Sequence, residues 1–180
     1  MDKISGKDQY WIQVAAHTGV RNSNGTPWSV QQIVAGLVGN AVITDSAVVY
    51  TPDGPSIWDV FVVTEDGRLI RVRVEFELQT HGFEEEESPY RKGNPVAATV
   101  HEAWVRKLSA AVRLDVDAVR VRANRFGEPS MDELDLSGVR LTFDDGFELD
   151  LGIDQKKIYD VEERNRVDRF IAAVRSHSKL

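Results

Sequence analysis

The segment that decides the fold reads VRLTFDDGFELDL, residues 139–151. Apolar and polar residues alternate on both sides of the DDG triplet at 144–146, which is typical of a β-hairpin. A three-residue loop places Phe143 opposite Phe147, whereas a two-residue loop would place Phe143 opposite Glu148. Directly opposed residues of an antiparallel pair share a face, so the three-residue loop is favoured. The segment therefore predicts an amphipathic antiparallel sheet, with the loop glycine in a left-handed conformation.

A second hairpin is predicted over residues 57–78, with EDG at 65–67 as its loop. A three-residue loop sets Asp59 opposite Arg73 on one face and apolar residues against one another on the other. A two-residue loop stays open as an alternative, because residues 57–63 are apolar on both faces, as a central strand would be.

Apolar residues also recur at helical spacing, and each such segment would bury one stripe on the sheet. The helices expected lie at residues 30–38, 96–113 and 160–176, with a shorter one at 5–18. Ser29 and Gln32 are predicted to form a capping box for the first. Asn94 and Pro95 would supply the N-cap and N1 residues of the second, and Asp160 the N-cap of the last.

These elements predict an α+β fold in a single domain over residues 1–180. It would have a largely antiparallel, twisted sheet of six to seven strands, with three to four packed amphipathic helices. The polar segments 79–93 and 127–137 are predicted to be flexible loops. The core is expected to contain Ile33, Leu37, Trp58, Val60, Val72, Val74, Trp104, Leu108, Leu141, Leu149, Phe170 and Ile171.

The composition is that of an ordinary globular protein, with 42% hydrophobic and 28% charged residues in 180. The chain contains no cysteine, so disulfide frameworks, thiolate nucleophiles and cysteine-based zinc sites are excluded. No apolar run approaches the roughly 20 residues that span a bilayer, and the N-terminus lacks the apolar core of a secretory signal. We therefore expect a cytoplasmic protein with no membrane association.

The net charge of −7 disfavours indiscriminate binding to nucleic acid and favours a basic protein partner. Residues 126–163 alone carry twelve Asp or Glu against three Lys or Arg. A local basic patch is also present, and it would either line a phosphate-binding groove or form solvated faces. It consists of Arg106, Arg113, Arg120, Arg122 and Arg125.

The sharpest candidate for catalysis is the group Asp59, Glu75 and Glu77, all expected on one face of the second hairpin. Paired carboxylates on adjacent strands can hold Mg²⁺ or Mn²⁺, which activates water for phosphodiester cleavage. The alternative is structural: Asp59 would pair with Arg73 across the strands, and the two glutamates would face solvent.

Two resemblances to known families follow from these elements. The predicted order αβββαβ over residues 30–123 resembles the core of the PD-(D/E)xK nucleases. Asp59 would match their first acid and Glu75-Phe76-Glu77 their second motif, with Glu77 in place of the usual lysine. This resemblance implies a metal-dependent nuclease.

The second half of the chain looks like the end of a bacterial PH-like domain, in which two strands and a C-terminal helix close a bent antiparallel sheet. The hairpin at 139–151 and the capped helix ending in RFIAAV, residues 169–174, carry this resemblance. It implies a binding scaffold and no particular chemistry.

We favour a non-catalytic intracellular interaction module, such as an adaptor, an inhibitor or an immunity-type protein, because the sequence contains no complete catalytic constellation. This interpretation requires no cofactor. The expected contact residues combine aromatic anchors with an acidic rim. They are Trp28, Phe83, Glu84, Glu85, Glu86, Glu87 and Tyr90. A merely solvated loop at 79–93 remains the alternative.

Overall fold

The computed structural model describes residues 6–20, 25–52, 54–123 and 129–180. The chain divides into two compact units, Met1–Lys107 and Leu108–Leu180. The prediction of a single domain over 1–180 therefore stays a prediction.

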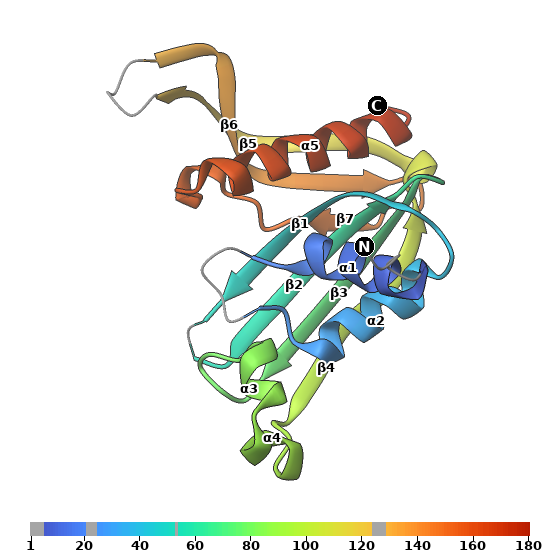
Figure 1. Cartoon of the computed structure of the whole chain (residues 1–180). Coiled ribbons are helices and arrows are strands. Elements are labelled where there is room, and N and C mark those ends of the chain that lie inside the picture. The colour runs from blue at the N-terminus through green and yellow to red at the C-terminus, as the bar shows by residue number, and fades with distance from the viewer. Residues whose placement is uncertain (1–5, 21–24, 53, 124–128) are drawn as a thin grey trace, which may run out of the picture. The chain divides into compact units, whose positions relative to one another are not determined.

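The first unit is built on a four-stranded antiparallel sheet in the order β1-β2-β3-β4 (Figure 1). Its strands are β1 (Ile43–Thr51), β2 (Ser56–Thr64), β3 (Arg68–Phe76) and β4 (Ala98–Lys107). Because the chain order equals the spatial order, each strand of this sheet pairs with the strand that follows it in the chain.

The hairpin of β2 and β3 has the predicted three-residue loop. Asp59 lies opposite Arg73, and Trp58 lies opposite Val74. Gly67 has a φ of 76°, as the left-handed position of this loop requires. The two-residue alternative is thus excluded.

Two helices cover one face of this sheet, α1 (Gly6–Thr18) and α2 (Trp28–Val38) (Figure 1). They bury a core with the inward side chains of β2 and β3, and Trp58, Val60, Val72 and Val74 are all at most 1% exposed. Ile33 and Leu37, predicted as core residues, are half-buried at its margin.

The start of α2 differs from the prediction. Its N-cap is Pro27, no side chain of the cap residue bonds to the helix, and the Ser29–Gln32 capping box does not form. The N–H group of Trp28 is instead bonded by a carboxylate from a distant segment, described below. The predicted end is correct, since Gly39 has a φ of 62° and donates to the carbonyl of Ala35.

The largest error of the sequence analysis concerns residues 96–113, which are not a helix. They form β4, a 3₁₀ turn η1 (Leu108–Ala110) and the start of β5 (Ala111–Ala123). Residues 98–107 contain several strand-forming residues, and the outer N–H and C=O groups of β3 need partners that this segment supplies. Burial alternates along β4 from His101 to Lys107, and Trp104 is half-buried instead of lying in the core.

Two details of this region follow from that change. The order αβββαβ is not formed, because a strand replaces its second helix. The pairing of β3 with β4 also shifts register between Arg73 and Val74, which lie opposite Glu102 and Val100 and so leave His101 as an extra residue in β4.

The predicted loop at 79–93 contains two single-turn helices, α3 (Phe83–Glu87) and α4 (Pro89–Gly93). Ser88 separates them, and its hydroxyl accepts a hydrogen bond from the N–H of Arg91, as an N-cap does. Figure 1 shows α3 and α4 at the end of the sheet where β4 begins. Asn94 and Pro95 follow α4 and start no helix.

The second unit contains a three-stranded antiparallel sheet, in the order β5-β6-β7, and one long helix. Its elements are η1 and β5, then β6 (Pro129–Phe143), β7 (Glu148–Asp150), the 3₁₀ turn η2 (Gln155–Lys157) and α5 (Val161–His177). The predicted loop at 127–137 is wrong from Pro129 onward, because these residues extend β6 along β5. Residues 127 and 128 lie outside the described part.

The deciding hairpin has the predicted register. Leu141 lies opposite Leu149, and the N–H of Phe143 donates to the carbonyl of Phe147 at 2.9 Å. Gly146 has a φ of 83°. The Asp160 side chain caps α5 by accepting from two backbone N–H groups, and the helix buries the expected stripe of Val167, Phe170, Ile171 and Val174.

A buried polar cluster joins α5 to the strands of this unit. The Arg122 guanidinium donates to Asp135 at 2.8 Å and to Asp168 at 3.2 Å. Gln155 is fully buried, donates to Asp168 and accepts from the N–H of Leu136. Every polar group named here has a partner, as burial requires.

The protein is thus α+β with antiparallel sheets, as predicted, but its strands form two sheets of four and three strands. The single sheet of six or seven strands is not confirmed. Of the twelve residues predicted for the core, nine are buried. The other three, Ile33, Leu37 and Trp104, are half-buried. No helix in the described ranges has the length and apolar character needed to cross a membrane.

A pair of glycines tests the register of the second unit. Gly138 and Gly146 both have positive φ, but a Cβ on Gly138 would lie 2.7 Å from the Asp117 Cβ, whereas Gly146 has open space. We expect Gly146→Ala to lower the free energy of unfolding by about 1–2 kcal/mol, the left-handed cost. Gly138→Ala should lower it by about 2–4 kcal/mol, because steric overlap adds to that cost. Urea denaturation measures both. Equal losses would contradict the placement of Asp117 against Gly138.

Candidate functional site

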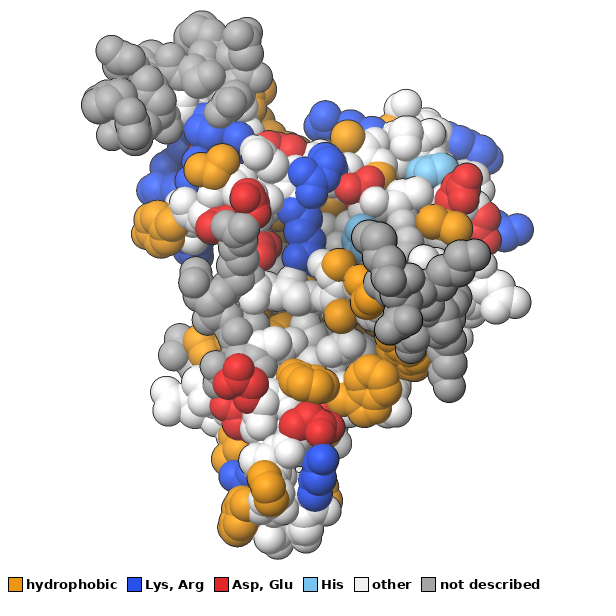
Figure 2. All heavy atoms as spheres, viewed as in Figure 1, with side chains coloured by type: hydrophobic (Ala, Val, Ile, Leu, Met, Phe, Trp, Pro, Cys, Tyr) orange, Lys and Arg blue, Asp and Glu red, His pale blue; other side chains and the backbone are white. Residues whose placement is uncertain are grey.

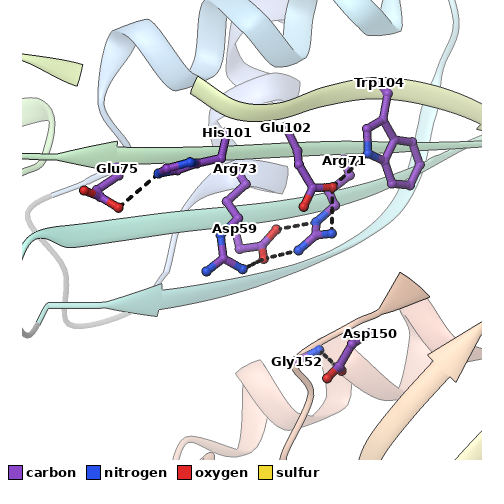
Figure 3. A network of polar contacts seen from close by, with 9 residues as sticks. All are labelled: Asp59, Arg71, Arg73, Glu75, His101, Glu102, Trp104, Asp150 and Gly152. Carbon is purple, nitrogen blue, oxygen red and sulfur yellow. Dashed lines mark hydrogen bonds and ion pairs between the residues drawn. The ribbon is translucent and has the colours of Figure 1, made fainter. Parts of the chain in front are cut away.

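Asp59, the first of the residues predicted to hold a metal, belongs to an ion-pair network on the face of β2 and β3 opposite α1 and α2 (Figure 3). Asp59 accepts from Arg71 Nε at 3.0 Å and Nη2 at 2.8 Å, and from Arg73 Nη1 at 3.1 Å. Asp59 and Arg71 are 7% and 8% exposed. Burial alone would lower the pKa of Arg71, but its hydrogen bonds and charge contacts with Asp59 and Glu102 raise it, so the guanidinium stays charged.

The other two carboxylates of that prediction lie elsewhere. Glu75 contacts Nε2 of His101 at 3.0 Å, as Figure 3 shows, and Glu77 is exposed beyond the end of β3. Within the described ranges, no three His, Asp or Glu side chains are grouped so that they could hold a metal ion. The alternative interpretation, cross-strand pairing of Asp59 with Arg73, is the one that the structure contains.

The network extends to β4. Arg71 Nη1 donates to Glu102 Oε2 at 2.8 Å, and the indole N–H of Trp104 donates to the same oxygen at 2.9 Å. The Arg71 guanidinium also lies over the Phe61 ring, 5.3 Å from its centre. Its position between three strands indicates that it holds the sheet together, so its role is structural.

The basic residues considered for a phosphate groove are engaged in part with acids. Arg113 pairs with Asp115 at 2.7 Å, and Arg122 belongs to the buried cluster of α5. Arg125 lies outside the described residues. Arg113 and Arg122 are therefore both paired with acids, so they do not form a row of free cations that a phosphate-binding groove would need.

The residues predicted for partner contact are brought to one end of the first unit. Phe83 and Tyr90 are 39% and 67% exposed, on α3 and α4. Glu84 and Glu87 are also exposed, whereas Glu85 is half-buried. Figure 2 shows hydrophobic, acidic and basic side chains interspersed over α3 and α4.

Trp28, the remaining member of that set, is half-buried and is not an exposed anchor. Its ring lies 4.4 Å from that of Trp11, centre to centre. It therefore contributes to the packing of α1 against α2 as well as to the surface near α3.

Glu86 links α3 to the start of α2. One carboxylate oxygen accepts from the backbone N–H of Trp28, and the other accepts from the Ser29 hydroxyl at 2.7 Å. His81 Nε2 lies 3.7 Å from that second oxygen. A carboxylate at a helix N-terminus satisfies N–H groups that lack partners within the helix and is favoured by the helix dipole. Glu86 thus supplies the cap that Ser29 was expected to provide.

The environment of Glu86 keeps it ionised. Burial raises the pKa of its carboxyl, but the nearby His81 ring and the hydrogen bonds from Ser29 and the N–H of Trp28 outweigh burial and lower the pKa below its ordinary value of 4.5. His81 is 2% exposed, and its ring stacks on Phe76 at 4.4 Å.

A pocket of about 360 Å³ opens beside this link. Its wall is formed by Trp28, Ser29 and Gln32 of α2, Phe76 of β3, His81, Glu86 and Glu87, Arg91 and Lys92 of α4, and Pro95, Val96 and Ala98. Apolar and charged side chains both line it, which suits a side chain or chain end of a partner, and the volume lies at the small end for ligand sites.

Sequence reasoning selected Glu86, Glu87 and Trp28 of this pocket but missed its two cations, Arg91 and Lys92, and its histidine, His81. The only signal for Arg91 was its position next to the predicted anchor Tyr90. No local pattern indicated His81, since its contact with Phe76 depends on the turn after β3.

Comparison of this chain with protein-family models, with curated proteins and with solved structures gives no match. Neither the PH-like domain nor the PD-(D/E)xK core is therefore supported by a known relative.

The Glu86 link predicts a pH-dependent stability. Glu86→Gln should lower the free energy of unfolding at pH 7 by about 1–2 kcal/mol, because a charged cap is lost. The native pKa is lowered, so this stability is fully present above pH 4.5 and is lost as the pH falls through the native value. Urea unfolding of both proteins between pH 7 and pH 3 measures the difference.

The matched control is Glu84→Gln, since Glu84 is an exposed neighbour in the same helix and should change stability by less than about 0.5 kcal/mol. A wild-type advantage over Glu86→Gln that persisted undiminished at pH 3 would contradict the cap.

The ion-pair network predicts no response to divalent metals. Millimolar Mg²⁺ or Mn²⁺ should leave the melting midpoint unchanged, because both Asp59 oxygens already bond guanidinium groups and a native-state ligand would raise it. Asp59→Asn should lower stability by about 3–5 kcal/mol, since it leaves Arg71 with a broken buried pair. Thermal melting and a plasmid-nicking assay check both points. A rise in the melting midpoint on addition of metal, abolished by Asp59→Asn and kept in Glu77→Gln, would contradict this expectation and indicate a metal site at Asp59.

Proposed function

We propose that this chain is a non-catalytic, intracellular protein-interaction module that binds an extended, basic segment of a partner as an additional strand beside β4. The adaptor, inhibitor and immunity-type roles expected from the sequence all need such a surface. The observation that carries the proposal is the exposed edge formed by β4, next to the contact residues of α3 and α4.

The edge has the length and exposure that strand addition needs. Among the described residues, β4 pairs with β3 on one side only, and it is ten residues long. The outer row of backbone groups of such a strand can bond to an extended peptide.

The side chains of β4 supply contact positions along this edge. Val100 and Val105 are 50% and 37% exposed, and they lie opposite the buried residues Val74 and Ile70. Exposed apolar residues on an edge offer packing sites for alternate side chains of an added strand. Their cross-strand partners belong to the core, so the contact would extend an existing apolar face.

Charge favours a basic segment. Residues 1–107 hold fourteen Asp or Glu and ten Lys or Arg, a net charge of −4. Glu84 and Glu87 are exposed on α3, near the start of β4. An acidic surface raises the encounter rate and the selectivity for cationic segments.

The nuclease alternative has weaker support. Its first acid, Asp59, is held by two arginines, and Glu77 stands apart from the pair that Glu75 makes with His101. No observation among the described residues favours it over the interaction module.

A peptide screen tests the proposal. A displayed library of random ten-residue peptides, selected against the whole chain, should yield basic sequences with apolar residues at alternate positions. The double variants Val100→Lys with Val105→Lys, and Val100→Glu with Val105→Glu, should both weaken binding of the selected peptides about tenfold, because each removes two apolar contacts. Fluorescence anisotropy measures the affinities.

The two charge signs separate packing from electrostatics, since only the lysine pair would weaken binding if charge alone mattered. Val42→Lys is the control, because Val42 is 50% exposed and precedes β1, away from β4. Failure to enrich any peptide, or equal losses in the control, would overturn strand addition at β4.

A further inference from the structure

The pocket of the candidate site lies at one particular end of β4. Ala98, the first residue of β4, forms part of its wall, together with Pro95 and Val96 just before the strand. A strand that adds antiparallel to β4 runs in the opposite direction, so its carboxyl end lies beside Ala98. An antiparallel segment that ends there would have its last residue at the pocket.

The pocket wall carries two carboxylates and two cations, which differ in their partners. Glu86 bonds to the start of α2, and Glu87 pairs with Lys92 at 2.9 Å. Arg91 is half-buried, and its guanidinium lies over the Tyr90 ring at 5.1 Å. No carboxylate among the described residues pairs with Arg91. The Arg91 guanidinium is therefore available to a ligand carboxylate, which a guanidinium binds through two parallel hydrogen bonds.

The rest of the wall suits the residue that carries that carboxylate. Trp28, Phe76 and Val96 form an apolar surface within about 360 Å³, enough for one side chain. An apolar wall also lowers the local dielectric, which strengthens an ion pair at its rim.

We infer that this pocket binds the free C-terminal carboxylate of the partner, whose last residues add antiparallel to β4. The inference rests on the proposed function and names the part of the partner that binds. The opposite orientation would put the partner's N-terminal ammonium at the pocket, where the two carboxylates are already bonded. It would also put the partner's C-terminus near Lys107, at the far end of β4.

Paired synthetic peptides test the inference. Each ten-residue peptide of a random array is made with a free C-terminal carboxylate and with a C-terminal amide, and binding of the whole chain is measured by anisotropy. The amide should bind about tenfold or more weakly, since it loses a charge-assisted pair. Arg91→Gln should remove this preference, and Arg91→Lys should restore part of it.

Lys107→Gln is the matched control and should retain the full preference for the carboxylate. Circular dichroism melting of each variant establishes that it is folded. Equal affinities for carboxylate and amide, with losses retained in the Val100 and Val105 variants, would overturn the inference and leave strand addition standing. A preference that depends on Lys107 instead of Arg91 would overturn it by reversing the orientation. No binding of either form would overturn the proposed function and the inference together.

Discussion

The guanidinium of Arg71 joins three strands of the four-stranded sheet, and much of the first unit depends on it. It bonds both oxygens of Asp59 on β2 and one oxygen of Glu102 on β4. A buried arginine is tolerated only when its donors have partners, so the position of one residue constrains the other two. Asp59 is thereby committed to a structural pair, and β4 is held against β3. Both consequences determine which surfaces remain for function.

The elements that could be predicted from the sequence are those whose pattern is local. Both hairpins have the expected loops because a glycine at positive φ and the pairing of apolar residues depend on a few neighbours. The α5 stripe and its Asp160 cap are local for the same reason. Residues 96–113 were not predictable in this way, because Val100, Trp104 and Leu108 are spaced as a helix stripe, although the first two lie in β4 and Leu108 in the turn η1. The unpaired edge of β3 decided between the two, and that edge exists only in the folded chain.

Residues of the candidate site could likewise be predicted only where their pattern is local. The sequence indicated residues 83–90 as a candidate contact segment, since aromatic and acidic residues concentrate there. It did not separate Glu86 from its three neighbours, because what distinguishes Glu86 is a bond to Trp28, 58 residues earlier in the chain. The pairing of Asp59 with Arg73 was foreseen from direct opposition, whereas the stronger contact with Arg71 runs diagonally and needs the length of an arginine side chain.

The extra residue in β4 affects whether the β4 edges of two identical chains can pair with each other. A long, flat edge strand is a template for stacking between identical chains, and β4 is long enough for this. At His101 the strand departs from a regular ladder, because Glu102 and Val100 lie opposite adjacent residues of β3. Such an irregularity bends the strand and increases its twist, so two rigid β4 edges cannot match along their whole length. A flexible chain end can follow the bend, whereas a second folded copy cannot. The irregularity at His101 therefore works against edge-to-edge pairing of identical chains along β4.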